Sequence, residues 1–513
     1  MNALEADLSV LTRGQAAGAP AQAGAASGVP MPWRRWKTCM LVPGVIIAAV
    51  AGCATVDPRA DYSRVAGHIA AATGREFAYR PDSDGRKVEE RIEHLLRAGL
   101  TADAAAEVAL LNNRGIQAAL FDVGAARADV VQAGLLANPT LSFGLRFPDA
   151  GGLANFEAAL VQNLADLWQI PVRQRAAERV LDRTILQIAG EISVAVFDTR
   201  RAYYRARQAD RKRDIATESV QIAQQVLDLA LARQQAGAGG EVDVNLARAE
   251  VQDAELALRN TTLESFESRS ALCTLLSLKV APDTLELTDE LPEPPAWTVA
   301  DQVLLDLAAE HRLDLRAAVQ ATEAAAARIR QEQLKLFPTL DVGLALERDE
   351  RRAPGESGGQ DAILGPTIGM ELPIFNQNQG GIARARFEYE QSRKLLDNLA
   401  VEVHQEARVA SARARTAWGT ASYYRDQVMP LRETSLELAR TAYQAGRTSL
   451  LNVLETQRAL LTARAGYADS LQASAAALVE LEKATGQPLA RILEAAEEAD
   501  HNEANEDRKD DAQ

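Results

Sequence analysis

The sequence predicts a mainly α-helical protein with a small β part, built from two similar halves. Two sequence patterns occur twice in the same order, about 200 residues apart, and a repeat of that length indicates a duplicated subdomain rather than a solenoid. Each half also combines short alternating segments, typical of strands, with helical segments of unusual length. The aromatic content of 5% is low and fits closely packed helices.

The repeated patterns frame the two halves. Pro139–Leu145 and Pro338–Leu344 share the pattern Pro-Thr-Leu-x-x-Gly-Leu. Farther along, Gln235-Ala236-Gly237 is followed by Val242-Asp243-Val244. In the second half, Gln444-Ala445-Gly446 is followed by the similar Leu451-Asn452-Val453. The expected first repeat, linker and second repeat are residues 100–280, 281–297 and 298–486.

The chain begins with a predicted export signal at residues 1–52, and we expect Met31 to be the true start. A basic segment precedes the apolar run Met40–Ala51, which is too short to span a bilayer as a helix. Val50-Ala51-Gly52-Cys53 resembles a bacterial lipobox, which implies a lipid on the Cys53 sulfur. The alternative is an ordinary secretory signal in which Cys53 is only a small residue.

Residues 53–99 are expected to form a lipid-anchored linker and a first helix. If Cys53 carries lipid, Cys273 is the only free thiol of the mature chain, so no intramolecular disulfide can form. Cys273 lies in an apolar helical run and is expected to be a small core residue.

Each half then starts with a pair of short helices. Thr101 can cap the first helix of the first half, and Thr298 with Asp301 has the pattern of a capping box in the second half. The second helices of the pairs are expected at about Arg114–Leu136 and Leu313–Leu336.

Two strands follow in each half. Along Leu141–Phe147 and Leu340–Glu347, apolar residues alternate with polar or small ones, which is the period of a strand with one apolar face. Return strands are expected at Phe156–Leu164 and Leu364–Leu372. Pro366 and Pro373 should lie near the ends of the last strand because proline cannot donate to a sheet ladder.

Each half continues as a very long helix and a return helix. Val172–Ala236 and Ile382–Ala445 would each extend roughly 100 Å at about 1.5 Å per residue, although Pro430 should kink the second. The turns that follow contain Gly237 and Gly446. We therefore expect a helical hairpin about 100 Å long below each strand hairpin. Residues 487–513 are acidic and are expected to be a disordered tail.

Four strands with one apolar face cannot form a stable isolated sheet, because that face and both edges would stay exposed. In a membrane such a sheet must close into a barrel, and single-chain outer-membrane barrels begin at about eight strands. Three chains would supply a twelve-stranded barrel with a polar, water-filled lumen. The alternative is a soluble helical rod with incidental extended segments.

Composition and motifs exclude several function classes. A net charge of −15 argues against a nucleic-acid partner. The sequence shows no nucleophile motif, phosphate-binding glycine loop or paired histidine and carboxylate motif. Its five histidines are isolated, without partners at metal-ligand spacing. We therefore expect no enzyme activity, no cofactor and no resident metal site.

Together these features resemble the TolC-like outer membrane factor family over about Leu100–Gly486. The resemblance rests on the duplication, on Leu315–Ala318 followed by Phe337–Leu340, and on Tyr443–Gly446 followed by Leu450–Leu454. It implies a homotrimer whose outer-membrane β-barrel is continuous with a long periplasmic α-helical barrel. Such proteins are exit channels of tripartite efflux systems or type I secretion ducts, and their partners are a periplasmic adaptor and an inner-membrane transporter.

The resemblance also assigns roles to the hairpin tips. The turns at Gly237 and Gly446, with Arg447 and Thr448, would contact the adaptor. Thr448 stands where some members have an arginine that helps to lock the closed state, so a lock here must use other pairs, with Arg447 as a candidate.

Four further residues would form the periplasmic aperture. Tyr443 matches the family's tip tyrosine, and Asp243, Asn452 and Glu455 match aperture positions that are often acidic. Three copies of Asp243 and Glu455 would give an electronegative ring that favours cations, although Asn452 departs from the usual acid. The alternative is that these residues are solvated positions at helix turns.

The cargo is expected to be small toxic compounds or metal cations. Metal cations are included because Gln132–Pro139 resembles family members that serve heavy-metal efflux pumps. The competing role is a periplasmic coiled-coil scaffold or adaptor. An adaptor would show a single helical hairpin flanked by β-rich domains, whereas this chain shows two hairpins.

Overall fold

The computed structural model describes residues 55–76, 79, 81, 85–147, 154–237, 239–293, 299–351 and 359–510. The expected export signal at residues 1–52, the candidate start Met31 and the candidate lipid anchor Cys53 lie outside the described residues. They stay predictions, as does the exact extent of the linker at residues 281–297.

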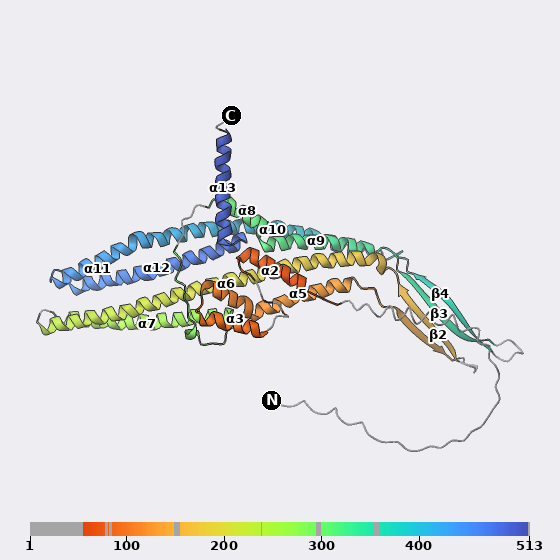
Figure 1. Cartoon of the computed structure of the whole chain (residues 1–513), viewed down its shortest axis with the longest axis horizontal. Coiled ribbons are helices and arrows are strands. Elements are labelled where there is room, and N and C mark those ends of the chain that lie inside the picture. Colours follow the sequence, from red (N-terminus) through yellow and green to blue (C-terminus); the bar gives the residue numbers. More distant parts are fainter. Residues whose placement is uncertain are drawn as a thin grey trace, which may run out of the picture. The chain divides into compact units, whose positions relative to one another are not determined.

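The same order of elements occurs twice along the chain (Figure 1). Two helices come first, α2 (Arg59–Thr73) and α3 (Gly85–Arg97). The first half then consists of α4 (Ala102–Asn112), α5 (Arg114–Ala133), β1 (Thr140–Arg146), β2 (Asn155–Asn163), α6 (Asp166–Gln235) and α7 (Glu241–Leu275). The second half consists of α8 (Asp301–His311), α9 (Leu313–Leu334), β3 (Leu340–Arg351), β4 (Gly359–Met370), α10 (Gln379–Tyr423), α11 (Met429–Gln444) and α12 (Leu450–Thr485).

The two halves start their first helices differently. The Thr101 hydroxyl accepts a hydrogen bond from the Ala104 N–H at 2.9 Å, so the expected cap of α4 is confirmed. The expected capping box of Thr298 with Asp301 does not place Asp301 correctly, because this residue is the first of α8 rather than its third. Thr298 lies outside the described residues. The Asp301 carboxylate instead accepts hydrogen bonds from Ser411 at 2.6 Å and Arg415 at 3.1 Å, which tie α8 to α10.

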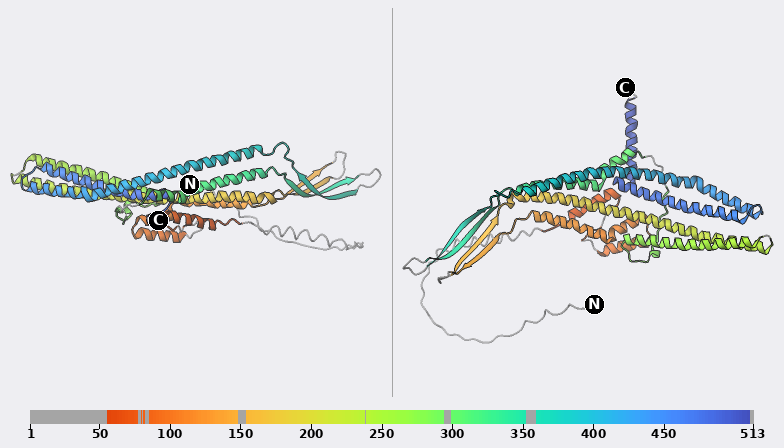
Figure 2. Two further views of the ribbon diagram at one scale, coloured as in Figure 1. Left: turned by 90° about the horizontal axis from the view of Figure 1, so that it is seen from above. Right: turned by 180° about the vertical axis from the view of Figure 1, so that it is seen from behind.

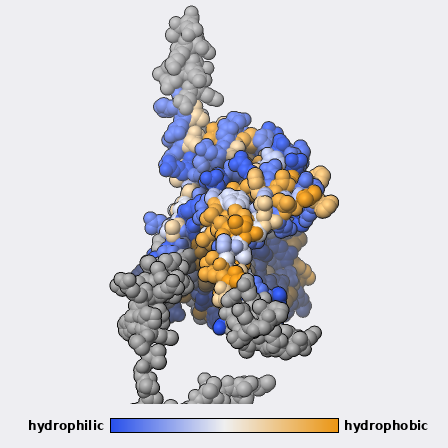
Figure 3. Space-filling model, turned by 90° about the vertical axis from the view of Figure 1, so that its right-hand side faces the viewer, coloured by the Kyte–Doolittle hydropathy of each residue, from blue (hydrophilic) through white to orange (hydrophobic). Residues whose placement is uncertain are grey.

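The four strands form one antiparallel sheet in the order β1-β2-β3-β4. Phe143 lies opposite Ala158, which lies opposite Leu346, which lies opposite Leu364, so these residues share one face. Both Phe143 and Leu364 have 69% of their surface exposed. The alternation expected from the sequence is therefore confirmed, and none of the residues that the structure describes covers the apolar face of the sheet. Figure 3 shows hydrophobic surface on the side of the molecule that carries the strands.

The expectation for Pro366 was wrong. This residue lies inside β4, paired with Leu344 of β3, rather than near a strand end. The strand order makes β4 an edge strand of the chain's sheet. An edge strand tolerates proline because the missing N–H can face away from the neighbouring strand.

The long helices are confirmed, but the hairpins are shorter than expected. Helix α6 has 70 residues, while its return helix α7 has only 35, or about 50 Å at 1.5 Å per residue. The half of α6 nearer the strands packs instead against α5 and α9 (Figures 1 and 2). Helix α10 likewise packs against α9 along one part and against α12 along another.

The expected interruption at Pro430 is confirmed and has a particular form. Helix α10 ends at Tyr423, a π-helical turn spans Tyr424–Val428, and α11 begins at Met429 with Pro430 in its first turn. A proline ring clashes with the carbonyl four residues earlier in a regular α-helix, and here that residue, Asp426, lies inside the π-helical turn.

The C-terminal segment corrects another expectation. Residues 487–513 were expected to be disordered, but Leu489–Asp510 form the helix α13. Ile492 and Ala496, four residues apart, are buried in a cluster with Leu304 of α8 and Leu481 of α12. The expectation of disorder considered only the acidic composition and overlooked these apolar residues, whose spacing is that of one helix face.

The connecting segment between the halves, residues 276–293, is held by the first half. Leu100 donates a backbone hydrogen bond to Glu286 at 2.7 Å, and Thr288 donates one to Leu100 at 2.9 Å. Cys273 is buried and free, as expected for a core residue, and burial raises the pKa of its thiol. None of the helices in the described part of the chain is long and apolar enough to cross a bilayer.

Candidate functional site at the hairpin tips

Both hairpin turns depend on a glycine in the left-handed region. Gly237 follows α6 with a φ of 71°, and Gly446 follows α11 with a φ of 69°. A Cβ at either position would meet nothing within 4 Å, so the backbone angle rather than space requires glycine. After Gly446, the Arg447 N–H bonds to the Ala442 carbonyl at 2.8 Å, which closes the end of α11.

The two tips of one chain pack against each other. Their shared core joins both hairpins and comprises Ala230, Val244, Ala247, Leu436, Tyr443, Leu450, Val453, Leu454 and Leu460. Two cross-hairpin ion pairs flank this core, Arg458 to Glu250 at 2.8 Å and Arg464 to Glu218 at 2.9 Å. The tip seam, as we call this contact between α6–α7 and α11–α12, is therefore apolar inside and charged outside.

Tyr443 lies at the centre of the tip seam. Only 5% of it is exposed, and the Arg233 guanidinium of α6 lies 4.6 Å from the centre of its ring. Arg233 also donates a hydrogen bond to the Tyr443 carbonyl at 3.2 Å. Burial raises the pKa of Tyr443, and the Asp243 carboxylate adds to the rise. The residue selected from the sequence thus joins the two hairpins through a cation–π contact.

The other expected aperture residues lie on the surface of the tips. Asp243 is half-buried in the first turn of α7. A carboxylate at this position stabilises the helix because the N-terminal end of the helix dipole is positive. Glu455 is exposed on α12, and Asn452 donates a hydrogen bond to Thr448 at 2.6 Å. Arg447 is exposed and makes no ion pair with any residue that the structure describes. Within one chain, no lock forms through Arg447 or Thr448 among the described residues.

Sequence reasoning missed two components of the tip seam. The Glu250–Arg458 pair joins residues more than 200 positions apart, and Glu250 is buried. Gln457 is also buried, and neither its amide nitrogen nor its amide oxygen has a hydrogen-bond partner in the described part of the chain. The only sequence signal was a polar residue in line with the apolar positions Leu450, Val453 and Leu460.

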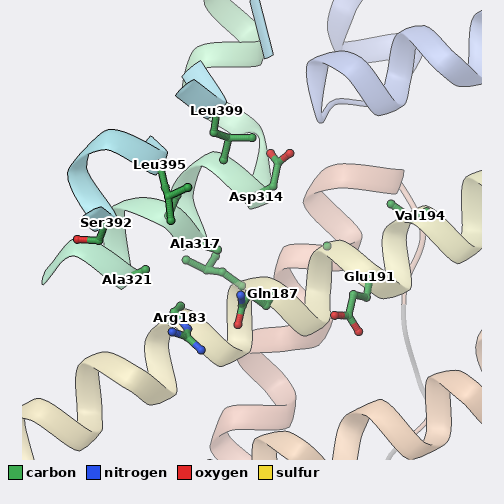
Figure 4. Close-up of a pocket in the computed structure, with 13 residues that line it drawn as sticks. Arg183, Gln187, Glu191, Val194, Asp314, Ala317, Ala321, Ser392, Leu395 and Leu399 are labelled. Carbon is green, nitrogen blue, oxygen red and sulfur yellow. The ribbon is translucent and has the colours of Figure 1, made fainter. Parts of the chain in front are cut away.

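A separate groove lies between α6, α9 and α10, nearer the strands (Figure 4). Its volume is about 630 Å³. Leu395 and Leu399 of α10 point toward α6, and Ala317 and Ala321 lie on α9. Its walls are mainly apolar, and Asp314 at its edge already pairs with Arg312. The groove therefore lacks the convergent polar groups of a reactive site. No group of side chains suited to hold a metal ion occurs in the described residues.

The comparisons with known proteins decide the family. The family described as outer membrane efflux protein matches residues 105–277 and 304–487, which together make up most of the chain. The chain belongs to this family. The TolC-like resemblance is thereby confirmed, and the protein is an outer-membrane component of an efflux system.

Curated relatives in this family are similar over most of their length. The chain is 26% identical to the cobalt-zinc-cadmium resistance protein CzcC of Cupriavidus metallidurans, over 76% of this chain and 90% of that protein. It is 27% identical to the pyoverdine export outer membrane protein OpmQ of Pseudomonas putida, over 75% of this chain and 85% of that protein.

Solved structures support the fold. A membrane protein from Pseudomonas aeruginosa superposes with a TM-score of 0.63 at 19% identity, covering 77% of this chain and 93% of that one. CusC superposes with a TM-score of 0.60 at 21% identity, covering 81% of this chain and 97% of that one.

Proposed function

We propose that this chain forms, as a homotrimer, the outer-membrane exit channel of a tripartite efflux system. The observation that carries the proposal is the sheet, whose apolar face is exposed and whose edge strands β1 and β4 have no partner within the described chain. Copies that pair β4 with the next β1 would satisfy both edges and turn the apolar face toward lipid. The two halves would then be products of an internal duplication.

The helical part would extend the channel through the periplasm to its partners. Gly237, Gly446 and Arg447 are exposed and Thr448 is half-buried. These turns lie at the end of the two helical hairpins opposite the strands (Figure 1). This position supports a contact with a periplasmic adaptor protein, which in turn would bind an inner-membrane transporter. A coiled-coil scaffold without a channel is the competing function, and it leaves the apolar sheet face unexplained.

The tips would also form the periplasmic gate. In a trimer, three copies of Asp243 and Glu455 would gather negative charge around the aperture, and such charge attracts cations. Tyr443 would hold the two hairpins of each chain together, and Asn452 would position Thr448. Because Asn452 is neutral, the ring would carry fewer charges than an all-acidic one.

The lipid anchor is proposed on sequence alone. Cys53 would carry the lipid, including palmitate, and tether the N-terminus to the outer membrane. Metabolic labelling with palmitate tests this directly. The wild-type protein should be labelled and Cys53→Ala should not. Equal labelling of both would show that the lipid is attached to a residue other than Cys53.

The cargo is proposed to be metal cations, with small toxic compounds as the alternative. The similarity to CzcC, named for cobalt, zinc and cadmium resistance, supports metals. The similarity to a toluene efflux pump protein of Pseudomonas putida supports small organic compounds. Survival of a deletion strain on cobalt, zinc or toluene distinguishes the two, and a secretion duct would change neither tolerance.

Single-channel conductance of the purified protein in planar bilayers tests the channel and the gate together. We expect small, cation-selective currents that divalent cations block, and larger or less selective currents for Asp243→Ala and Glu455→Ala. If both variants conduct like the wild type, the channel proposal stands, but Asp243 and Glu455 do not form the gate. Failure of a folded, lipidated trimer to insert would reject the channel.

A further inference from the structure

The groove between α6, α9 and α10 (Figure 4) has the size and the lining of a small-molecule site. Its volume of about 630 Å³ lies within the range of pockets that hold drug-sized compounds. Most of its wall is apolar and includes Val194, Ala321, Leu395 and Leu399. Leu395 has 62% of its surface exposed. An apolar compound in the groove would therefore remove a large leucine surface from water, which favours binding.

One end of the groove carries a cation whose hydrogen-bonding capacity is not satisfied. Arg183 of α6 is half-buried, and its Nε atom is buried with no hydrogen-bond partner in the described part of the chain. Its neighbour Asp182 is engaged by Arg64 at 2.7 Å, while Arg179, one turn earlier, pairs with Glu323 at 2.8 Å. A guanidinium that has lost water without gaining an acceptor favours an anionic group beside it.

The other end of the groove carries the opposite charge. Glu191 lies on the same face of α6 as Arg183 and Gln187 (Figure 4). Arg183 and Glu191 are eight residues apart, or about 12 Å along the helix axis. Glu191 is exposed, so its carboxylate keeps its hydration and gains little from a partner. The groove therefore favours a compound with an apolar body whose anionic group lies at the Arg183 end.

The groove faces away from helix α2. Ile185 and Ile188 of α6 are buried in one core cluster with Val65 and Ile69 of α2. Gln187, which lines the groove, follows Ile185 by two positions, and two positions along an α-helix turn the side chain by about 200°. In the proposed homotrimer, three copies of the layer that contains α2 would fill the channel if they lay inside it. That layer would therefore lie outside, and the groove would open into the lumen.

We propose that this groove is a cargo subsite on the channel wall that binds drug-sized amphiphilic organic anions. The apolar body would lie against Leu395 and Leu399, and the anionic group would accept hydrogen bonds from Arg183. A metal cation would not use an apolar groove, because it needs oxygen, nitrogen or sulfur ligands. The groove thus adds a second class of cargo. Its place in the lumen rests on the proposed channel function, whereas binding can be measured without conduction.

Two fluorescent compounds that share one aromatic body test the role of the charge. One is 1-anilinonaphthalene-8-sulfonate, and the other is the uncharged N-phenyl-1-naphthylamine, which lacks the sulfonate. Each is titrated into the purified full-length protein, with protein-free micelles as the blank. The wild type should bind the sulfonate more tightly than the neutral compound. Arg183→Gln should weaken sulfonate binding about tenfold and leave the neutral compound unaffected, and Arg183→Lys should restore part of the loss.

Two further variants separate a local contact from a general effect of charge. Arg205 is exposed on the same side of α6 as Gln187, 18 residues or about five turns farther along, and lies outside the groove. Arg205→Gln should bind both compounds like the wild type, and Glu191→Gln should not weaken sulfonate binding. Equal losses in Arg183→Gln and Arg205→Gln would overturn the assignment of Arg183, as would a loss in Glu191→Gln equal to that in Arg183→Gln.

Thiol labelling locates the bound compound. Ser392 lines the groove, and Ser435 of α11 lies outside it; both are half-buried, and both hydroxyls donate to a backbone carbonyl of their own helix. The sulfonate should slow maleimide labelling of Ser392→Cys several-fold and leave Ser435→Cys unchanged.

The outcomes of these tests are separate from those of the channel experiment. Sulfonate binding without protection of Ser392→Cys would overturn the groove as the site, as would no binding beyond the micelle blank. A wild type that binds the sulfonate in the groove but does not conduct would reject the proposed channel and leave the binding site standing.

Discussion

Replacing Arg269 with methionine is expected to destabilise the junction of α6, α7 and the connecting segment. Arg269 donates two hydrogen bonds to the Asp210 carboxylate, at 2.9 Å and 2.7 Å, and a third to the Leu285 carbonyl at 2.6 Å. Ser265 donates to the same carboxylate at 2.6 Å. Asp210 is only 1% exposed. One arginine thus holds together three segments of the first half.

The size of the effect follows from the charge left behind. Arg269→Met keeps most of the apolar stem but removes the two hydrogen bonds from Arg269 to the buried Asp210 carboxylate. That carboxylate keeps the hydrogen bond from Ser265 and the more distant Arg207 and Arg213 guanidinium groups, at 3.6 Å and 3.9 Å, so the cost should lie toward the lower end of the range for a broken buried pair. Removing one partner of a buried ion pair costs about 3–5 kcal/mol. Asp210→Leu combined with Arg269→Met removes both charges and should cost clearly less than the sum of the two single changes.

Acid pH supplies an independent check on the same pair. Burial raises the pKa of Asp210, but the hydrogen bonds from Arg269 and Ser265 outweigh it, so the net pKa lies below the ordinary 3.8. A carboxyl with a depressed pKa stabilises the fold above its unfolded pKa, and this contribution is lost as the pH falls through the folded value. The wild type should therefore lose this stability below about pH 4, and the double variant should lose less.

Thermal melting of the purified protein at fixed protein and detergent concentration is the assay, because the stability of an oligomer depends on concentration. Arg259→Met, at an exposed position of the same helix α7, is the control and should melt like the wild type. Melting of Arg269→Met at the temperature of this control would refute the reasoning, as would strict additivity in the double variant.

Three further predictions concern the sheet, the tips and the N-terminal helix. Gly343→Val should prevent assembly of the proposed homotrimer on gels, since a Cβ there would lie 2.6 Å from the Leu160 carbonyl oxygen. A Cβ at Gly365 would meet nothing within 4 Å, so Gly365→Val should assemble. Tyr443→Ala should expose the tips to limited proteolysis because truncating a buried aromatic costs about 3–5 kcal/mol, whereas Tyr443→Phe should resist it like the wild type. Burial and two nearby arginines lower the pKa of His68 from 6.5, so stability should fall as the pH drops below about 6.5, and His68→Gln should reduce that loss on melting.

Local patterns explain which features could be predicted from the sequence. Strand alternation is a period-two signal contained within a few residues, and Leu141–Phe147 displays it without reference to the rest of the chain. The helix ends are equally local, because a glycine such as Gly237 or Gly446 after a long periodic run is a common C-terminal signal. Tyr443 was found for another reason, its match to a family position.

The features that were missed depend on distance in the chain or on competition between segments. Nothing near Glu250 indicates that Arg458 will pair with it, since the two meet only when the hairpins pack. The return helices were expected at Val242–Leu278 and Leu450–Thr485, and α7 and α12 confirm them. Only the expected hairpin length of about 100 Å was wrong, because α5 and α9 pack on the part of the long helices that the return helices do not reach. The helix α13 was missed because the charge of its residues outweighed the buried Ile492 in the sequence argument.

The two halves differ at one place along their long helices. Counted back from the glycine turns, Pro430 corresponds to Gln221 in the middle of α6, and Gly466 corresponds to Ala257 of α7. The first half therefore has neither the proline that interrupts the long helix nor the glycine against which the Tyr424 ring packs. The same order of elements is thus built with a continuous long helix in one half and an interrupted one in the other, because a single proline is enough to end a regular helix.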